Sequence, residues 1–123
     1  MPAKVTGLVP MAHVADVQRS VTFYEHLGFK MKDSLTNKAG HLAWAFIESE
    51  HAELMFALAS EPVIAPQQAV LFYLYTSDLS WLRRELLAQN IKVSSVTYPE
   101  YMPAGEVRIE DPDGYVLLVG QCN

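Results

Sequence analysis

The chain has 123 residues, which is the length of one globular domain, and 50% of them are hydrophobic, which is too many for a disordered protein. Its net charge of −5, with only nine Lys and Arg residues, argues against a nucleic-acid partner, because those side chains supply the affinity for phosphates. The single cysteine cannot form an internal disulfide, and no apolar run approaches the ~20 residues that span a bilayer. We therefore expect a cytoplasmic protein without a membrane partner.

The first half of the chain predicts a strand, a helix and further strands. Residues 8–14 are apolar enough for a strand, and Asp16 opens a run with apolar residues at helical spacing that ends at Gly28. An Asp side chain accepts hydrogen bonds from the free N–H groups of a first helical turn, and Gly tolerates the left-handed conformation that ends a helix. Strands are expected after this helix, at residues 42–47 and 52–58.

The second half repeats this order at an offset of 62 residues. The offset carries Asp16 onto Asp78 and Gly28 onto Asn90, which also tolerates the left-handed conformation. The segment Asp111-Pro112-Asp113-Gly114 predicts a tight turn, because Pro fixes φ and Gly permits a positive φ. We expect a helix from Asp78 to Asn90 among strands at residues 70–76, 106–110 and 115–120.

These elements predict an α+β protein built from two modules of order β-α-β-β-β. The chain is then a single domain, residues 1–123, in which residues 1–60 form the first module and residues 67–123 the second. Residues 61–66 are expected to be a linker, because Pro62 and Pro66 disfavour a helix or a central strand.

The segment from Val14 to Tyr24, with Leu27-Gly28-Phe29, resembles the first strand and helix of the vicinal oxygen chelate superfamily. That superfamily includes glyoxalase I, bleomycin-resistance proteins, fosfomycin-resistance enzymes and extradiol dioxygenases. Residues 109–115 look like its turn before the last strand. The resemblance covers nearly the whole chain and implies two βαβββ modules forming a cupped mixed sheet, the glyoxalase/bleomycin resistance fold. It implies no single activity, because the superfamily spans lyases, transferases, dioxygenases and binding proteins.

The resemblance also implies four positions for the ligands of a divalent metal, which superfamily enzymes fill with His, Gln or Glu. Three of the positions carry Val9, Leu71 and Leu118, and the fourth carries Glu53 or, in another alignment, Met55. Aliphatic side chains have no lone pair to donate, and a catalytic metal site needs about three protein ligands. We therefore expect neither a metal nor a cofactor, as in the bleomycin-resistance branch.

Strand alternation then predicts which side chains face the expected cup. Glu106 and Arg108 are placed there by resemblance to glyoxalase I, where that strand face contacts substrate, and His13 falls where glyoxalase I carries a substrate-anchoring arginine. Residues 98–103 are aromatic and stiffened by proline, and can close over the mouth. Two alternatives stay open: Glu106 and Arg108 pair with each other, or the tyrosines fill the core. The expected ligand pocket comprises Met11, His13, Glu53, Met55, Tyr73, Tyr75, Tyr98, Tyr101, Glu106 and Arg108.

Apolar walls with a few polar groups are typical of a small-molecule site. The leading hypothesis is a metal-free protein that sequesters or senses an aromatic or cationic ligand. The alternative is an enzyme, either metal-dependent with a displaced ligand set or acid–base with His13 and Glu53 or Glu106. The resemblance further implies a homodimer, with modules paired within or between chains. Trp44, Phe46 and Trp81 can serve its interface or the core.

Overall fold

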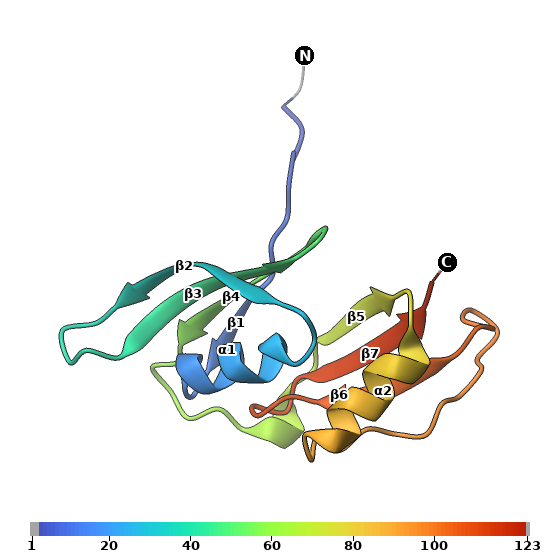
Figure 1. Ribbon diagram of the computed structural model, residues 1–123. Coiled ribbons are helices and arrows are strands. Elements are labelled where there is room, and N and C mark those ends of the chain that lie inside the picture. Colours follow the sequence, from blue (N-terminus) through green and yellow to red (C-terminus); the bar gives the residue numbers. More distant parts are fainter. Residues whose placement is uncertain (1–2, 123) are drawn as a thin grey trace. The chain divides into compact units, whose positions relative to one another are not determined.

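The computed structural model describes residues 3–122, which form two compact units divided between Val63 and Ile64. Each unit contains one α-helix and one mixed sheet (Figure 1). The two units are described in turn. No helix among residues 3–122 is long and apolar enough to cross a membrane.

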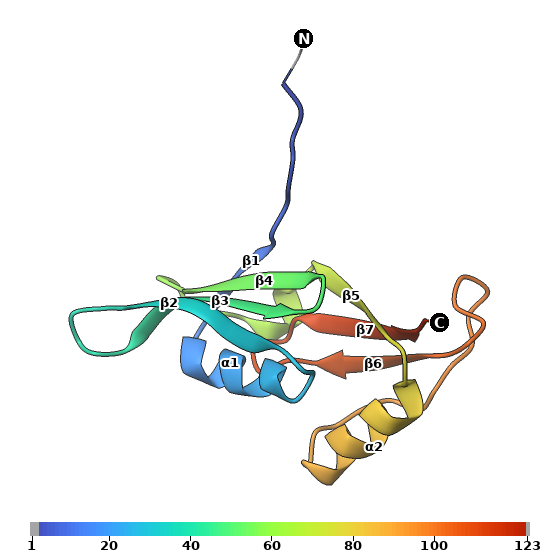
Figure 2. The ribbon, with the colours of Figure 1, turned by 45° about the horizontal axis from the view of Figure 1, so that its top comes forward.

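The first unit has the predicted order of one strand, one helix and three strands. Its elements are β1 (Met11–Val14), α1 (Val17–Glu25), β2 (Lys30–Thr36), β3 (Leu42–Ser49) and β4 (Ala52–Leu58). The strands form a sheet in the order β1-β4-β3-β2, in which β1 runs parallel to β4 and the other neighbours are antiparallel. The α1 helix covers one face of this sheet (Figures 1 and 2).

Both ends of α1 follow from the residues that predicted them. Asp16 is the N-cap, and its Oδ1 accepts a hydrogen bond from the backbone N–H of Arg19 at 3.0 Å. Gly28 ends the turn after the helix with a φ of +91°. Between these ends Val21 and Tyr24 are buried, and the Tyr24 ring lies 5.1 Å from that of Phe56 on β4. The face covered by α1 is therefore the core of this unit.

The second unit contains β5 (Leu71–Thr76), α2 (Leu79–Ala88), β6 (Glu106–Glu110) and β7 (Val116–Gln121). Its sheet has the order β5-β7-β6, with β5 parallel and β6 antiparallel to β7. Asp78 is the N-cap of α2 and accepts a hydrogen bond from Trp81 N–H at 3.1 Å, while Asn90 has a φ of +62°. The helix packs on one face of the sheet (Figure 2), where the buried side chains are Leu82, Leu86, Val107, Ile109, Leu117 and Val119.

One strand of the second module is reduced to two isolated bridges, which pair Val93 with Ile109 and Thr97 with Glu106. Thr97 and Glu106 exchange backbone hydrogen bonds of 2.9 Å in both directions. At the position between these bridges the N–H of Arg108 donates to Ser94 Oγ at 2.8 Å, so a hydroxyl replaces the carbonyl that a strand would offer. The two bridges also differ in register by one residue, so no continuous ladder forms. The regular elements of the second module therefore follow the order β-α-β-β.

The segment before β5 also differs from the expectation of an irregular linker. A short 3₁₀ helix, η1 (Ala65–Gln67), begins within it and has Pro66 in its first turn. Proline is tolerated at that position because the N–H it lacks would have no partner in the helix.

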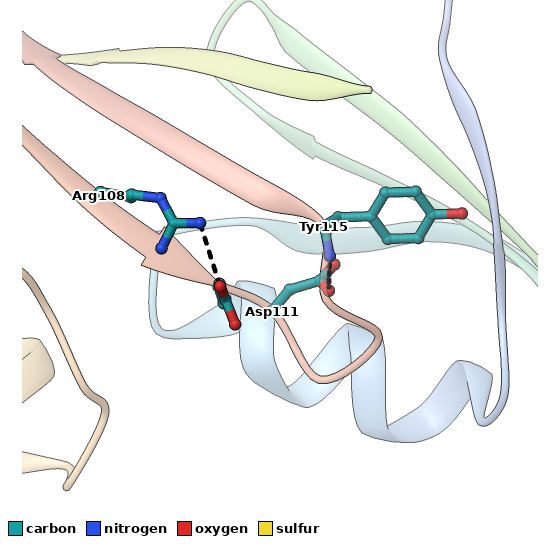
Figure 3. A network of polar contacts seen from close by, with 4 residues as sticks. Arg108, Asp111 and Tyr115 are labelled. Atoms are coloured by element: carbon teal, nitrogen blue, oxygen red, sulfur yellow. Dashed lines mark hydrogen bonds and ion pairs between the residues drawn. The ribbon is translucent and has the colours of Figure 1, made fainter. Parts of the chain in front are cut away.

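The predicted turn before β7 forms as expected. Asp111 Oδ1 accepts hydrogen bonds of 2.9 Å from the N–H groups of both Asp113 and Tyr115. Figure 3 shows the second of these bonds. Gly114 has a φ of +86°, and a Cβ at this residue would lie 2.5 Å from the Cβ of Ala65. The turn therefore requires glycine both for its backbone conformation and for its contact with η1.

Candidate functional site

The face of the second sheet that α2 leaves uncovered carries most of the predicted polar residues. Side chains alternate along a strand, so the burial of Leu117 and Val119 on the helix side turns Leu118 and Gly120 to the open side. The register then aligns three cross-strand rows on this open face: Tyr75 with Gly120 and Glu106, Tyr73 with Leu118 and Arg108, and Leu71 with Val116 and Glu110.

Three tyrosines and one carboxylate come together on this face, and we call Tyr73, Tyr75, Tyr101 and Glu106 the tyrosine–carboxylate cluster. The Tyr73 hydroxyl donates to Glu106 Oε1 at 2.6 Å, and the Tyr101 hydroxyl donates to Oε2 at 3.0 Å. The ring centroid of Tyr73 lies 5.2 Å from that of Tyr75 and 6.2 Å from that of Tyr101. Glu106 is only 7% exposed, whereas Tyr75 and Tyr101 are 66% and 65% exposed. The cluster thus surrounds a buried carboxylate with accessible aromatic rings.

Gly120 allows the side chain of Tyr73 to reach Glu106 across the central strand. Tyr73 is on β5 and Glu106 is on β6, and β7 lies between them. A Cβ at Gly120 would lie 2.9 Å from the Tyr73 hydroxyl oxygen and 2.6 Å from Cε of Met102. Glycine inside a strand often marks such a close approach, and this signal in the sequence could have identified Gly120, which the predicted site did not include. Met102 was predicted only as part of the segment 98–103, and its contact with Gly120 had no signal in the sequence.

Two of the cluster's three hydroxyl groups, those of Tyr73 and Tyr101, are held in the protonated form by their surroundings. Burial, together with the hydrogen bond to Glu106, raises the pKa of Tyr73 well above its ordinary value. The hydrogen bond to Glu106 is the main cause that raises the pKa of Tyr101. Ionising either phenol would place a second negative charge beside the carboxylate, so both hydroxyls act as donors to Glu106 at neutral pH.

Arg108 pairs with Glu110 rather than with Glu106. Its Nη2 lies 3.1 Å from Glu110 Oε1, a contact that the dashed line from Arg108 marks in Figure 3. Both side chains are more than half exposed. The alternative in which Glu106 and Arg108 pair with each other is therefore wrong. The other alternative, in which the tyrosines fill the core, does not describe Tyr75 or Tyr101, because both are largely exposed.

Tyr98 lies apart from the contacts that define the cluster. It is 69% exposed, and its ring edge is near Gly105 together with side chains of Val96 and Leu79. Leu79 belongs to α2, so this tyrosine faces the helix side of the unit.

The remaining predicted residues share the open face of the first sheet. The register pairs Met11 with Met55, and Met55 with Phe46, while Glu53 pairs with Glu48. Met11 and His13 are exposed, whereas their neighbours Ala12 and Val14 are buried against α1. Trp44 and Phe46 lie on this open face as a half-buried aromatic pair, with ring centroids 6.4 Å apart.

A separate groove of about 480 Å³ lies beside the start of α1 in the first unit. Asp16, His41, Leu42 and Leu58 are among the residues that line it. None of the predicted site residues lines this groove, and Asp16 is already engaged as the helix cap.

The two-module α+β architecture defines the fold class, and comparison of the sequence defines the family. Residues 9–119 match the Glyoxalase/Bleomycin resistance protein/Dioxygenase superfamily. The chain belongs to this superfamily, which confirms the resemblance seen in its motifs. No curated protein sequence matches the chain.

Solved structures show the same fold at low sequence identity. A bleomycin-binding protein complexed with bleomycin is 18% identical and has a TM-score of 0.76, with 97% of this chain and 100% of that chain covered. A bleomycin resistance determinant encoded on transposon Tn5 is 18% identical, with 95% and 98% covered and a TM-score of 0.75. An antibiotic-binding protein from a Streptomyces species is 19% identical, with 99% and 100% covered and a TM-score of 0.75.

The donor groups of this chain do not fit the divalent metal of the superfamily's enzymes. Leu71 and Leu118 occupy two of the implied positions on the open face of the second sheet, and Val9 precedes β1. Within residues 3–122, no three or more His, Cys, Asp or Glu side chains gather closely enough to hold a metal ion. The tyrosine–carboxylate cluster offers aromatic contact and hydrogen bonding to a carboxylate.

Proposed function

We propose that this chain is a cytoplasmic small-molecule-binding protein of the glyoxalase/bleomycin-resistance type. It sequesters or senses an aromatic or cationic ligand without using a metal. The tyrosine–carboxylate cluster is the observation that carries this proposal. The proposal is also supported by the solved structures of similar fold, two of which are named for binding bleomycin or an antibiotic.

The exposed rings of Tyr75 and Tyr101 suit a flat or positively charged ligand. Each ring is about two-thirds exposed, although large aromatic side chains in soluble proteins usually bury most of their surface. An aromatic face attracts a cation by about 0.5–2 kcal/mol, depending on how much water is removed. The chain's net charge of −5 adds a weak general preference for cations.

The cluster also has the composition expected of a site that orients a ligand. In small-molecule sites, apolar and aromatic surfaces supply affinity, and a few polar groups fix the orientation. Leu118 and Met102 flank the cluster and are half-buried, and Glu106 is its one charged group. A ligand could therefore stack on the rings while one of its polar groups meets the carboxylate.

A thermal-shift screen of aromatic and cationic compounds tests the proposal. A ligand at about 100 times its dissociation constant should stabilise the folded protein by about 2.7 kcal/mol, which is a readily measured rise in Tm. Tyr75→Leu and Tyr101→Leu should weaken the response, because each removes a stacking surface. Trp81→Leu, which removes a ring that is 52% exposed on α2, is the matched control and should leave it unchanged. A screen in which no aromatic or cationic compound stabilises the protein would contradict the proposal.

We also propose that the chain assembles as a homodimer. Met11 on the first sheet and Leu71 on the second are 53% and 56% exposed on open strand faces, and burying them would be favourable. Sedimentation equilibrium should therefore give about twice the chain mass of 13.8 kDa. A mass of one chain at micromolar concentrations would refute this assembly.

A further inference from the structure

The hydrogen-bond directions within the tyrosine–carboxylate cluster leave Tyr73, Tyr101 and Glu106 with acceptors and no free donor, whereas the hydroxyl of Tyr75 can still donate or accept. A tyrosine hydroxyl has one proton, and those of Tyr73 and Tyr101 are both donated to Glu106. Each hydroxyl oxygen keeps a lone pair that can accept a hydrogen bond from elsewhere. A carboxylate has about four lone-pair positions, of which the two tyrosines use two. Three oxygen-bearing groups thus offer acceptor capacity at one place.

The negative charge of Glu106 also lacks a cationic partner among residues 3–122. Its hydrogen-bond partners are two neutral phenols, and the nearest arginine along β6, Arg108, is paired with Glu110. A carboxylate that is only 7% exposed has lost much of its contact with water. Partial desolvation strengthens the attraction of such a group for a cation that can reach it.

We propose that the tyrosine–carboxylate cluster binds an N–H-bearing organic cation, of which a primary ammonium on an aromatic molecule is the simplest form. This inference rests on the proposed small-molecule function and specifies its ligand. An ammonium group has three donors and no acceptor, which complements the acceptors that Glu106, Tyr73 and Tyr101 offer together. Alcohols are poorer partners because they carry no charge, and a carboxylate ligand would be repelled by Glu106. A quaternary ammonium has the charge but no N–H to donate.

The residues that would hold the ammonium are fixed to different degrees. Glu106 is held on β6, where its backbone pairs with Thr97 on one side and with Gly120 on β7 on the other. Tyr73 lies over Gly120, where the lack of a side chain leaves room for it, and its hydrogen bond to Glu106 fixes its hydroxyl. Tyr101 stands on the loop between Thr97 and Glu106, so its oxygen and ring can adjust to the body of the ligand. The carboxylate therefore sets the position of the cation, and the tyrosines set its surroundings.

Isothermal titration calorimetry with three matched probes tests this specificity. Benzylamine, benzyltrimethylammonium and benzyl alcohol share one ring and differ in charge and in N–H donors. A charge-assisted hydrogen bond discriminates strongly, so benzylamine should bind about tenfold or more tightly than either of the others at pH 7. Equal binding of benzyl alcohol or benzyltrimethylammonium would overturn the inference and leave the proposed function standing. Failure of all three probes to bind would also overturn the inference. The proposed function would still stand if the thermal-shift screen found a stabilising aromatic or cationic compound that carries no N–H-bearing cation.

Two variants locate the effect at the cluster. Glu106→Gln keeps the shape of the side chain, removes the charge and turns one acceptor into a donor, so it should lower benzylamine affinity about tenfold. Glu85→Gln removes the same charge from the exposed side of α2 and should leave the affinity unchanged. If Glu106→Gln fails to fold, Tyr101→Phe is the second variant, because it removes one acceptor from an exposed side chain. It should weaken the binding of benzylamine and leave the binding of benzyl alcohol and benzyltrimethylammonium unchanged. Unchanged benzylamine affinity in folded Glu106→Gln or, failing that, in Tyr101→Phe would overturn the inference.

Discussion

Replacing Tyr73 with phenylalanine removes one hydroxyl from the tyrosine–carboxylate cluster and keeps the ring. The lost hydrogen bond is 2.6 Å long and ends on a carboxylate that is 7% exposed. Hydrogen bonds to charged groups contribute about 1.5–3 kcal/mol net, and the lower end applies to Tyr73 because its side chain is half-buried and water screens the charge in part. We therefore expect Tyr73→Phe to lower the free energy of unfolding by about 1.5 kcal/mol.

Urea unfolding followed by circular dichroism measures this loss, and Tyr101→Phe provides the comparison. Tyr101 makes the second hydrogen bond to Glu106 at 3.0 Å from a side chain that is 65% exposed, so its replacement should cost less. The loss caused by Tyr73→Phe should also shrink in a Glu106→Gln background, because the charged acceptor is then absent. A loss from Tyr73→Phe no larger than that from Tyr101→Phe, or one that is unchanged in that background, would refute the reasoning.

Alkaline titration and glycine replacement test two other features. Tyr73 and Tyr101 should form phenolate late in an alkaline titration followed by ultraviolet absorbance, because both have a folded pKa above the ordinary 10.0. The contribution of these raised pKa values to the free energy of unfolding is fully present below pH 10 and is lost as pH rises through the folded pKa values. An ultraviolet titration without a late phase that Tyr73→Phe removes would contradict the raised pKa of Tyr73. Gly114→Ala should lower the free energy of unfolding by about 2 kcal/mol or more, because a strained φ of +86° is joined by a contact with backbone atoms of Ala65. Gly40 has a φ of +85°, and a Cβ there would meet no atom, so Gly40→Ala should lower the free energy of unfolding by less. Equal losses for the two variants in urea unfolding would show that the contact of Gly114 with Ala65 is unimportant.

Local signals in the sequence predicted the helices and the last turn. Asp16 and Asp78 cap the two helices through the hydrogen bonds that an Asp at this position is expected to make. Gly28 and Asn90 both adopt the positive φ predicted for the helix ends. These features depend on a few neighbouring residues, so the sequence contains nearly all the information needed to predict them.

Edge strands were harder to predict, because their pattern does not show which face is buried. Most residues of β2 are exposed, so Lys30–Thr36 has no alternation of buried and exposed positions to indicate a strand. The segment that pairs with β6 at Val93 and Thr97 breaks its ladder at Ser94, where a side-chain hydroxyl takes the backbone donor. Whether a backbone N–H donates to a side-chain hydroxyl or to a backbone carbonyl depends on the tertiary structure, which hydrophobic periodicity does not indicate.

The candidate site was predictable in its strand residues and not in its detailed contacts. The family resemblance indicated which face of these strands is the inner one, and with alternation it put Tyr73, Tyr75 and Glu106 together. The register aligns all three residues on one face of the sheet. The pairing of Arg108 with Glu110 depends on side-chain rotamers, which alternation does not determine. The role of Gly120 depends on what crosses above it from a strand that is distant in sequence.

The reduced strand of the second module has a consequence for how binding preference can change. Residues 98–104 lie between two fixed points, the Thr97–Glu106 pair and the hydrogen bond from Gln121 N–H to Gly105 O at 2.9 Å. No strand ladder runs through this segment, so its length and composition can vary while β6 and β7 keep their pairing. Tyr101 and Met102 belong to this exchangeable segment, whereas Tyr73 and Glu106 belong to the sheet. Replacing only residues 98–104 with the corresponding segment of a relative should therefore alter the shape of the ligand that binds, while the carboxylate of Glu106 stays in place.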